Sequence, residues 1–408
     1  MKTPLRFKKI FVSEQSAEDA VTRRVLDYFP NVPVAWVSDE AALVHQLAAL
    51  SLTEGKRYLW LTRHRGAFIK YCPGATNTAE HYRCCNYLVI NEAAGCPIEC
   101  NYCFLQAYVN NPAITVYTNV EDIEAELLAL SQANPGRILR VGTGELADSL
   151  ALDPVVRVAE TLASAVEKTP NILLEFKTKS DHVDHLLALK PGNFVVSWSL
   201  NPEWIVQHAE HKSAPLEQRL QAMKRLSDAG FLLGIHFDPI VYYPEWESGY
   251  RELIQRIAGH VAADRIAWIS LGSFRTPQGL KEQVRVRFPK SPVLIGEQVR
   301  TPDGKLRYIK PLRRRMYERV VSWIGRHLGE VFIYFCAESA DLWESVLGLQ
   351  PADADEVDFL FARNLHRRFP ELGLPEPALD IYRQPIRVSP QQEEKTLQPG
   401  GQPVKLLF

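Results

Sequence analysis

Short apolar runs alternate with amphipathic segments of helical length along most of this chain. The apolar runs are rich in β-branched and aromatic residues, which predicts strands, and the segments between them have the periodicity of helices. Strands are expected at residues 87–93, 137–144, 171–179, 193–201, 231–240 and 265–274, and helices at 120–133, 154–168, 215–230 and 250–262. This alternation predicts an α/β fold, a partial (β/α)6 barrel of the TIM type, with a doubly wound open sheet as the structural alternative.

Shorter units are expected on both sides of this barrel. Strand patterns lie at 8–13, 32–38, 57–63 and 331–338, and helix patterns at 17–29 and 314–328. The end of the chain is rich in Pro, Gln and Glu, which is typical of irregular segments. We therefore expect a small α/β N-terminal extension over 1–82, the barrel over 83–290, a C-terminal α/β extension with a basic stretch over 291–350, and a largely irregular tail over 351–408.

Composition and charge limit the compartment and the partners that we expect for this protein. Of the 408 residues 46% are hydrophobic, which suffices for a packed core, and the net charge of −1 gives no global attraction for nucleic acid. Seven cysteines, an odd number, do not indicate a secreted disulfide framework. The sequence has no signal-peptide pattern and no apolar run of membrane-spanning length. We expect a cytoplasmic protein without membrane contact, and favour a monomer.

Three cysteines with the spacing C-x3-C-x2-C are the most specific chemical feature. Cys96, Cys100 and Cys103 lie in the run GCPIECNYCFLQ, directly after the first strand expected in the barrel. A [4Fe–4S] cluster is held by cysteine thiolates, and three of them leave one iron without a protein ligand. A zinc site and plain thiols are the alternatives, although zinc usually takes four protein ligands, or three and a water.

Polar residues follow the expected barrel strands at their carboxyl ends. Active sites of such barrels lie at this end, so we expect these residues to face one mouth together with the cysteine loop. They are Gly142, Thr143, Gly144 and Glu145 after the second strand, Lys177 and Lys179 on the third, Ser199 and Asn201 on the fourth, and His236 and Asp238 on the fifth.

Several motifs together resemble the spore photoproduct lyase family of radical SAM enzymes. The cysteine run followed by NPAITVYTNVEDI resembles the cluster region of that family. KTKSDHVDHLL and WSLN resemble its third-strand and fourth-strand motifs, and LGIHFDPIVYYPEWESGY resembles its fifth strand and the following loop. The resemblance implies a [4Fe–4S] cluster on the three loop cysteines, S-adenosylmethionine at the open iron, and a flavodoxin or ferredoxin as electron donor.

The resemblance also implies cofactor-binding roles. Gly144 and Glu145 resemble the segment that binds the amino group of S-adenosylmethionine, a charge-assisted contact. Lys179 matches the family lysine that pairs with the cofactor carboxylate, Ser199 matches a serine at the cofactor, and Asn201 is a further candidate.

The candidate set also includes two alternate positions on the fifth strand and one position in the cysteine loop. His236 and Asp238 are expected to bind substrate or the ribose of the cofactor, with a satisfied buried polar pair as the alternative. Tyr102, the aromatic residue before the last loop cysteine, resembles a relay tyrosine of the family.

Two positions depart from the family pattern. Glu145 falls where the family has the cysteine that returns a hydrogen atom to the product radical, and Phe104 falls where it has a second tyrosine. The resemblance therefore implies a divergent member without the hydrogen-donor cysteine. Cys336, at the end of the strand expected at 331–338, is the thiol expected to replace it, and an inert core thiol is the alternative.

Two further features leave alternatives open. Cys72, Cys84, Cys85 and Cys336 are the four ligands that a second [4Fe–4S] cluster needs, although adjacent cysteines seldom ligate one cluster. The basic stretch at 305–319 fits phosphate contacts and equally a solvated helix face.

The leading hypothesis is a radical SAM enzyme of the spore photoproduct lyase-like family. It would reductively cleave S-adenosylmethionine to a 5′-deoxyadenosyl radical for hydrogen abstraction, with lesion-containing DNA as the first expected substrate and DNA repair as the process. Modification of another nucleotide, of RNA or of a peptide is the enzymatic alternative. A non-catalytic iron–sulfur protein that binds nucleic acid is the alternative from another class, and Glu145, Lys179 and Ser199 argue against it because a pure binding protein does not need them.

Overall fold

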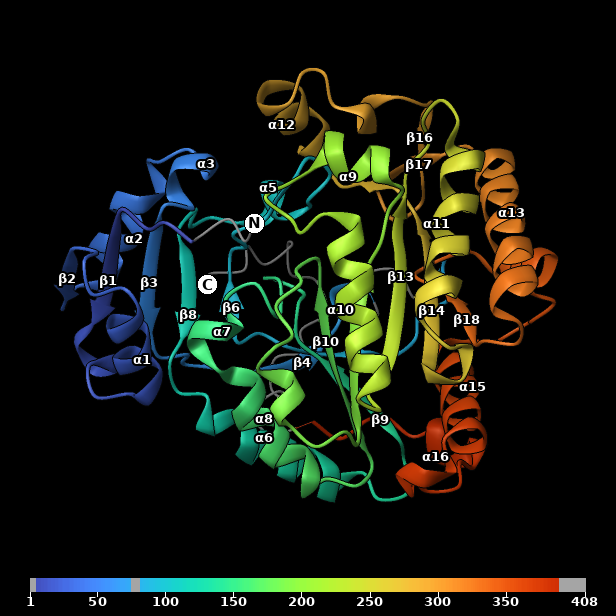
Figure 1. The fold of residues 1–408 in the computed structure, drawn as a ribbon, viewed down its shortest axis with the longest axis horizontal. Coiled ribbons are helices and arrows are strands. Elements are labelled where there is room, and N and C mark those ends of the chain that lie inside the picture. The colour runs from blue at the N-terminus through green and yellow to red at the C-terminus, as the bar shows by residue number, and fades with distance from the viewer. Residues whose placement is uncertain (1–4, 75–80, 389–408) are drawn as a thin grey trace.

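A curled sheet of eight strands forms the centre of the molecule in the computed structural model, which describes residues 5–74 and 81–388 (Figure 1). Seven of its strands run parallel, and β4 at one edge is antiparallel. In spatial order the strands are β18 (Ile333–Phe335), β14 (Ile266–Ser273), β13 (Leu232–Ile240), β11 (Phe194–Ser199), β10 (Ile172–Thr178), β9 (Leu139–Gly142), β5 (Leu88–Ile90) and β4 (Ile69–Tyr71). The predicted partial barrel is confirmed, and its six expected strands all lie within their predicted ranges.

Helices cover the outer face of this sheet (Figure 1). Gly230 follows α10 (Leu216–Asp228) with a φ of +91°, which confirms the end of the helix expected at 215–230. The helix expected at 154–168 is divided, because Arg157 takes a left-handed conformation between α7 (Asp153–Val156) and α8. The main covering helices are α6 (Glu121–Ala133), α8 (Val158–Glu167), α10 (Leu216–Asp228), α11 (Trp246–His260) and α13 (Lys310–Leu328).

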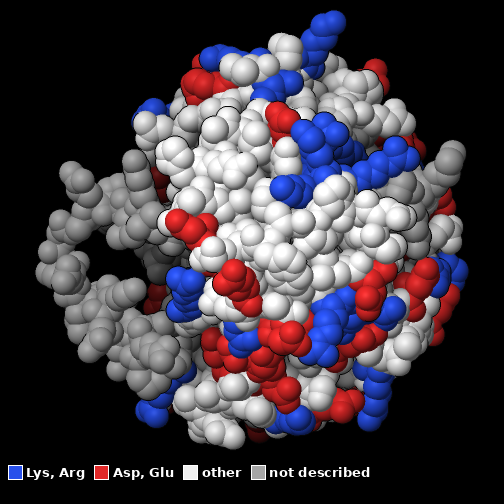
Figure 2. Space-filling model, turned by 90° about the vertical axis from the view of Figure 1, so that its left-hand side faces the viewer, with Lys and Arg blue, Asp and Glu red and all other residues white. Residues whose placement is uncertain are grey.

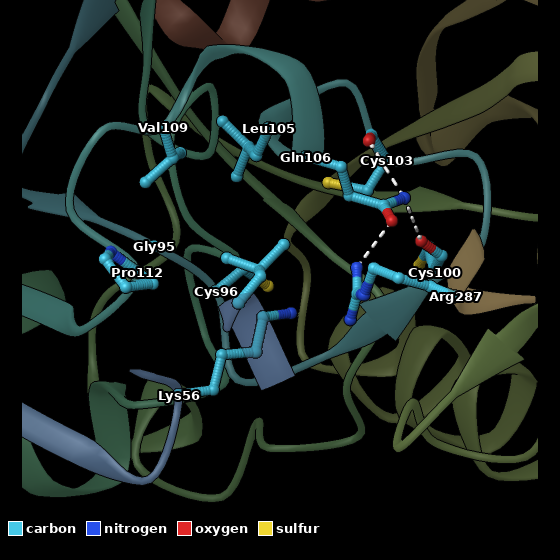
Figure 3. A pocket seen from close by; sticks show the side chains of 11 residues that line it. Lys56, Gly95, Cys96, Cys100, Cys103, Leu105, Gln106, Val109, Pro112 and Arg287 are labelled. Atoms are coloured by element: carbon cyan, nitrogen blue, oxygen red, sulfur yellow. Dashed lines mark hydrogen bonds between the residues drawn. The ribbon is translucent and has the colours of Figure 1, made fainter. Parts of the chain in front are cut away.

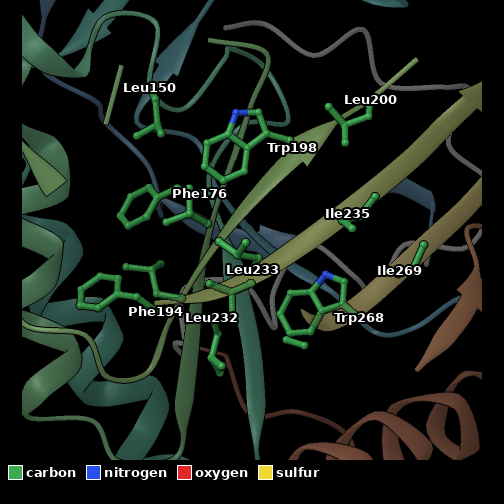
Figure 4. Packing of buried hydrophobic residues seen from close by; sticks show 14 of the residues in the cluster. Leu150, Phe176, Phe194, Trp198, Leu200, Leu232, Leu233, Ile235, Trp268 and Ile269 are labelled. Atoms are coloured by element: carbon green, nitrogen blue, oxygen red, sulfur yellow. The ribbon is translucent and has the colours of Figure 1, made fainter. Parts of the chain in front are cut away.

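The two faces of the barrel strands differ in chemistry because successive side chains point to opposite sides. Large apolar side chains such as Phe176, Trp198 and Ile235 are buried in the hydrophobic core (Figure 4). Polar side chains occupy the alternate positions, and several of them meet inside the barrel: Glu175, Ser197 and His236 share hydrogen bonds there. The strands therefore carry a dry outer face and a polar inner face.

A second sheet of five strands lies beside the barrel. Its order is β2 (Val34–Val37), β1 (Lys9–Ser13), β3 (Tyr58–Thr62), β8 (Ile114–Tyr117) and β6 (Ala93–Ala94). The strands β1, β2 and β3 confirm the patterns expected near the start of the chain. However, β8 and β6 come from the range expected for the barrel, on either side of the cysteine loop, and β8 pairs in parallel with β3. The cysteine loop is thus held between the two sheets.

The C-terminal part is more ordered than its composition indicates. β18 is the seventh parallel strand of the barrel. Helices α15 (Ala354–Arg368) and α16 (Leu379–Tyr382) lie in the range where an irregular tail was expected, because Val357, Phe361 and Leu365 give α15 a buried apolar face. Residues 389–408, which carry most of the Pro and Gln signal, lie outside the described residues.

A buried ion pair fixes α15 to the barrel. The Asp358 carboxylate lies 2.8 Å from an Arg137 nitrogen and 3.5 Å from an Arg140 nitrogen, and all three side chains are at most 5% exposed. Arg137 precedes β9 and Arg140 belongs to it, so this contact ties α15 to the second barrel strand. Among the described helices, none is both long and apolar enough to cross a membrane.

Replacement of Asp358 by Ala is expected to destabilise the protein by about 3–5 kcal/mol, because two buried guanidinium groups lose their counter-charge. Urea denaturation followed by circular dichroism measures this change. The control is Asp380→Ala, since Asp380 is 95% exposed and its partner Arg383 is 3.9 Å away. Equal stability of the two variants would contradict the prediction.

Candidate active site

The loop that carries the three cysteines leaves the barrel after β5 and is held by backbone contacts on both sides. Gly95 has a φ of +84°, and a Cβ there would lie 3.0 Å from the Ala113 carbonyl oxygen, so the position requires glycine. Further along, β7 (Glu99–Cys100) pairs with β12 (Glu210–His211), which follows the fourth barrel strand and its helix. The fold therefore holds the loop at the mouth of the barrel, as the strand order predicted.

Cys96, Cys100 and Cys103 line one cavity (Figure 3). The Lys56 amino group points toward this space and donates to the Ile98 carbonyl at 2.6 Å. Burial raises the pKa of the Cys96 thiol to about 12, and burial also raises that of Cys100, with the nearby Lys179 charge acting in the opposite direction. All three cysteines are free thiols.

Gln106 braces the turn that contains these thiols. Its side-chain amide donates to the backbone carbonyls of Asn101 at 2.8 Å and Cys103 at 3.2 Å. Arg287, from α12 (Leu280–Arg287), donates in turn to the Gln106 side-chain oxygen at 2.5 Å. Gln106 and Arg287 line the same cavity as the thiols, so these contacts hold the cysteine turn at the cavity wall.

The three thiols offer the ligand chemistry of an iron–sulfur cluster. Thiolate sulfur is the ligand that iron–sulfur clusters take, and a four-iron cluster spreads its ligands over a wider space than one ion does. Within residues 5–74 and 81–388, no three His, Cys, Asp or Glu side chains converge closely enough to hold a single ion.

A buried polar network lies behind the cysteine loop. The Tyr102 hydroxyl donates to Glu210, and the Asn201 amide donates to Glu210 at 3.0 Å and to the Tyr102 oxygen at 3.2 Å. Arg219 lies 2.7 Å from the second Glu210 oxygen, with both side chains fully buried. Tyr250 donates to the Asn201 side-chain oxygen at 2.7 Å. The polar groups of Asn201 are therefore engaged within the protein.

Lys179 connects this network to the cysteine loop. Its amino group lies 5.7 Å from the centre of the Tyr102 ring, and its charge acts on both Cys100 and Glu210. Its backbone N–H donates to Asp148 at 2.7 Å, which fixes the end of β10 to the loop after β9. This is a suitable place for a cation that would meet an anionic group beside the cysteines.

The loop after β9 comes very close to β10 at Gly144. That residue has a φ of +92°, and a Cβ there would lie 2.9 Å from the Lys177 carbonyl oxygen. Glu145 follows at once, partly exposed. Burial alone would lower the pKa of Lys177, but the negative charges of Glu145 and Glu175 raise it above its ordinary value. Glu145 therefore lies close enough to Lys177 for the two charges to interact.

Glu175 is the centre of a second network, deeper in the barrel. One carboxylate oxygen accepts from Ser197, from His236 at 2.7 Å and from Trp268 at 3.3 Å, and the other accepts from Tyr87. Burial would raise the pKa of Glu175, but the His236 charge and these hydrogen bonds lower it to about 2. The carboxylate is therefore ionised and fully partnered although only 2% of the residue is exposed.

His236 and Asp238 both point into the barrel but do not form a pair with each other. His236 bonds to Glu175, whereas the Asp238 carboxylate lies 3.0 Å and 3.1 Å from one Arg275 nitrogen. Ser199, at the end of β11, is 5% exposed, and its carbonyl accepts from Arg219 at 3.1 Å. The expected residues thus gather around one mouth in two groups, one beside the cysteine loop and one around Lys177 and Asp238.

The basic side chains of the stretch at 305–319 pair with acidic neighbours, but seven of them share four carboxylates. Lys310 and Arg314 pair with Asp341, and Arg315 and Arg319 pair with Glu247. The buried members are paired as well: Arg307 with Asp303 at 2.6 Å and Arg313 with Glu338 at 3.1 Å. On the opposite face, near the N-terminal sheet, Lys and Arg are interspersed with Asp and Glu around a broad uncharged area (Figure 2). The pairing reduces the positive charge of the stretch without removing it, because Lys310, Arg314, Arg315 and Arg319 share two carboxylates.

The remaining cysteines, Cys72, Cys84, Cys85 and Cys336, lie near enough to one another for their charges to interact. Cys84 packs with Tyr82 and Ala337 and donates to the Gly74 carbonyl at 3.1 Å. Its neighbour Cys85 packs instead against the main core. The two side chains of this adjacent pair pack in different surroundings, although both act on Cys336.

Sequence reasoning missed four residues that organise the site: Glu175, Glu210, Arg275 and Arg287. An acidic residue in the middle of the apolar run ILLEFKT was a signal for Glu175, because a buried carboxylate requires partners. The other three carried no local signal, since their partners are distant in sequence.

A curled parallel sheet with a three-cysteine loop after its first parallel strand defines the class of radical SAM enzymes. The family model for spore photoproduct lyase matches residues 78–327. This covers more than half of the chain, and the chain belongs to the spore photoproduct lyase family.

Individual relatives agree with this assignment. The chain is 29% identical over 244 residues to the spore photoproduct lyase of Geobacillus sp. (strain Y412MC61), covering 57% of this chain and 72% of the relative. It is 28% identical over 245 residues to that of Bacillus subtilis (strain 168), covering 57% and 71%. A solved spore photoproduct lyase complexed with dinucleoside spore photoproduct has a TM-score of 0.70 at 22% identity, covering 82% of this chain and all of that one.

Replacement of Glu175 by Gln is expected to destabilise the protein by about 3–5 kcal/mol, because Gln removes the charge that His236 faces and places an N–H₂ group against other donors. Thermal and urea denaturation at pH 7 measure the loss. Glu217→Gln is the control, since Glu217 is an exposed carboxylate on α10. A variant as stable as the control would contradict the prediction.

The same carboxylate contributes a defined pH dependence. Its pKa is depressed in the folded state, so its stabilising effect is complete above about pH 4.3, the value of an unperturbed Glu, and is lost as the pH falls toward 2. Wild-type stability is expected to fall more steeply than that of Glu175→Gln across this interval.

Proposed function

We propose that this chain is a radical SAM lyase that holds a [4Fe–4S] cluster on Cys96, Cys100 and Cys103 and repairs a pyrimidine lesion in DNA. The observation that carries the proposal is the cavity lined by these three thiols at the mouth of the parallel barrel. When bound and reduced by a flavodoxin or ferredoxin, the cluster would supply the electron that cleaves S-adenosylmethionine into methionine and a 5′-deoxyadenosyl radical. The protein positions the reactants and shields the radical.

The charged groups at the mouth match the two ends of the cofactor's methionine. Lys179, beside Cys100 and Tyr102, would bind the carboxylate. Glu145, next to the close approach of Gly144 to β10, would bind the amino group. Ser199 is buried next to this place, whereas Asn201 acts through Tyr102 and Glu210, whose positions it fixes.

The substrate proposal rests on the relatives. Solved spore photoproduct lyases hold dinucleoside spore photoproduct, and one mutant holds AdoMet as well. A lesion buried in a duplex must be taken out of the base stack before it reaches a barrel interior. We propose that recognition depends on the shape of the extruded lesion, since part of the charge of the basic stretch is taken up by Asp341 and Glu247.

Replacement of all three loop cysteines by Ala is expected to abolish cluster binding. The wild type, reconstituted anaerobically with iron and sulfide, should bind about four irons and release 5′-deoxyadenosine when dithionite and S-adenosylmethionine are added. The triple variant should do neither. The matched control is Cys84→Ala, which removes a thiol outside the cavity. Iron and a reduced-cluster EPR signal that survive in the triple variant would contradict the proposal, and about eight irons in the wild type would point to a second cluster.

Truncation of Lys179 or Glu145 to Ala is expected to weaken S-adenosylmethionine binding by about 1.5–3 kcal/mol, or about 10-fold to 150-fold, because each removes a hydrogen bond to a charged group. Equilibrium dialysis with the reconstituted protein measures the affinity. Lys168→Ala, which changes an exposed lysine paired with Glu124 on the outer helices, is the control. Unchanged affinity in both test variants would contradict this assignment.

A further inference from the structure

Cys336 points into the barrel from the seventh parallel strand. Phe335 packs outward against Tyr317 of α13, with ring centres 4.6 Å apart, and Tyr334 lies on the inner side, where it acts on Glu175. Because side chains alternate along a strand, Cys336 shares the inner face with Tyr334. Its backbone N–H donates to the Leu271 carbonyl at 2.9 Å, which continues the pairing of β18 with β14.

An arginine and an aspartate from two other strands hold this cysteine. One Arg275 nitrogen lies 3.3 Å from the Cys336 sulfur, and the other donates to the Cys336 carbonyl at 2.9 Å. The same guanidinium binds Asp238 at 3.0 Å and 3.1 Å. Gly272 makes room for this carboxylate, since a Cβ there would lie 2.5 Å from an Asp238 oxygen. β13, β14, β15 (Arg275–Thr276) and β18 therefore all contribute to the placement of one thiol.

The thiol stays protonated in these surroundings. Burial raises the pKa of Cys336 to about 12, with Asp238 acting in the same direction and Arg275 in the opposite one. The titratable and charged groups that face it are Arg275, Asp238, Lys177, Lys305, Tyr334, Cys72, Cys84 and Cys85. A protonated thiol retains the S–H bond that a hydrogen-atom donor must have.

We propose that Cys336 is the hydrogen-atom donor of this enzyme and that Arg275 and Asp238 are its positioning residues; the inference rests on the proposed function. After the lesion's cross-link breaks, a carbon radical remains on the substrate. The Cys336 S–H bond breaks homolytically, the hydrogen atom forms a C–H bond with that carbon, and the sulfur keeps one electron as a thiyl radical. A small-molecule thiol then gives a hydrogen atom to the thiyl sulfur and restores Cys336.

The enzyme needs a hydrogen-atom donor elsewhere because of the residue at position 145. Glu145 occupies the place where the resemblance locates the family's cysteine, and a carboxylate has no weakly bound hydrogen atom to give. Glu145, Asp238 and Cys336 all act on Lys177, so the thiol and the carboxylate of Glu145 lie around the same lysine. Cys72 is the competing thiol, because the charges of Glu145 and Cys336 both act on it.

Deuterium transfer tests the donor. The reduced, reconstituted enzyme is incubated in D₂O with S-adenosylmethionine and dinucleoside spore photoproduct, and the thymine product is analysed by mass spectrometry. Thiol hydrogens exchange with solvent, so the wild-type product should carry one deuterium. In Cys336→Ala the ratio of repaired product to 5′-deoxyadenosine should fall at least tenfold, while Cys72→Ala and Cys84→Ala keep the wild-type ratio and label. A label that persists in Cys336→Ala, or is lost in Cys72→Ala, overturns the proposal.

Thiol alkylation tests the positioning residues without substrate. Asp238→Asn leaves Arg275 beside the sulfur, so iodoacetamide should modify Cys336 at least threefold faster at pH 8, measured by peptide mass spectrometry. Arg275→Gln should slow it. A merely structural contact would leave the alkylation rate of Cys336 unchanged. Unchanged rates in both variants therefore overturn the positioning role.

The two experiments separate this inference from the proposed function. Failure to release 5′-deoxyadenosine in the wild type overturns the proposed function itself. Release of 5′-deoxyadenosine without consumption of the lesion overturns the proposed substrate, and the alkylation rates then decide by themselves whether Arg275 and Asp238 control the Cys336 thiol.

Discussion

The barrel is organised around one buried carboxylate, that of Glu175. A charge removed from water is tolerated only when donors surround it, and here those donors come from β11, β13, β14 and the residue before β5. Each donor must reach the same two oxygen atoms, so the register of these strands and the inward direction of their side chains are fixed together. A slip of one residue in any strand would turn its donor to the outer face and leave the charge unpartnered.

The residues at the mouth of the barrel continue along β10 from Glu175. Glu175, Lys177 and Lys179 follow one another at every second position and therefore share the inner face. Each belongs to a different group: Glu175 to the deep network, Lys177 to Glu145 and Asp238, and Lys179 to Tyr102 and the cysteine loop. Toward the mouth, β10 thus carries in order the buried carboxylate, the lysine beside Glu145 and Asp238, and the lysine beside the cysteine loop.

Charge is balanced locally throughout the molecule. The buried arginines meet acids, as Arg137 and Arg140 meet Asp358, Arg219 meets Glu210, and Arg275 meets Asp238. The same holds for the exposed basic side chains of α13. Such pairing fixes the positions of long side chains and weakens the long-range attraction of a polyanion. The net charge of −1 is consistent with this picture.

The sequence by itself determined the features that depend on neighbouring residues. The alternation of apolar runs located the six barrel strands, and the spacing of Cys96, Cys100 and Cys103 identified the loop that brings three thiols together. Local patterns also indicated α1 (Ala20–Tyr28) and the first three strands. These elements follow from side-chain periodicity, which a short window of sequence contains.

Only the tertiary structure decided what joins distant parts of the chain. It placed β8 in the N-terminal sheet, made β18 the seventh barrel strand and docked α15 through Asp358. It also brought Cys336 to Arg275 and Asp238, residues separated from it by 61 and 98 positions. The physical reason is that a buried charge or thiol is defined by partners that the fold supplies, and a linear pattern carries no record of which strand will lie beside which.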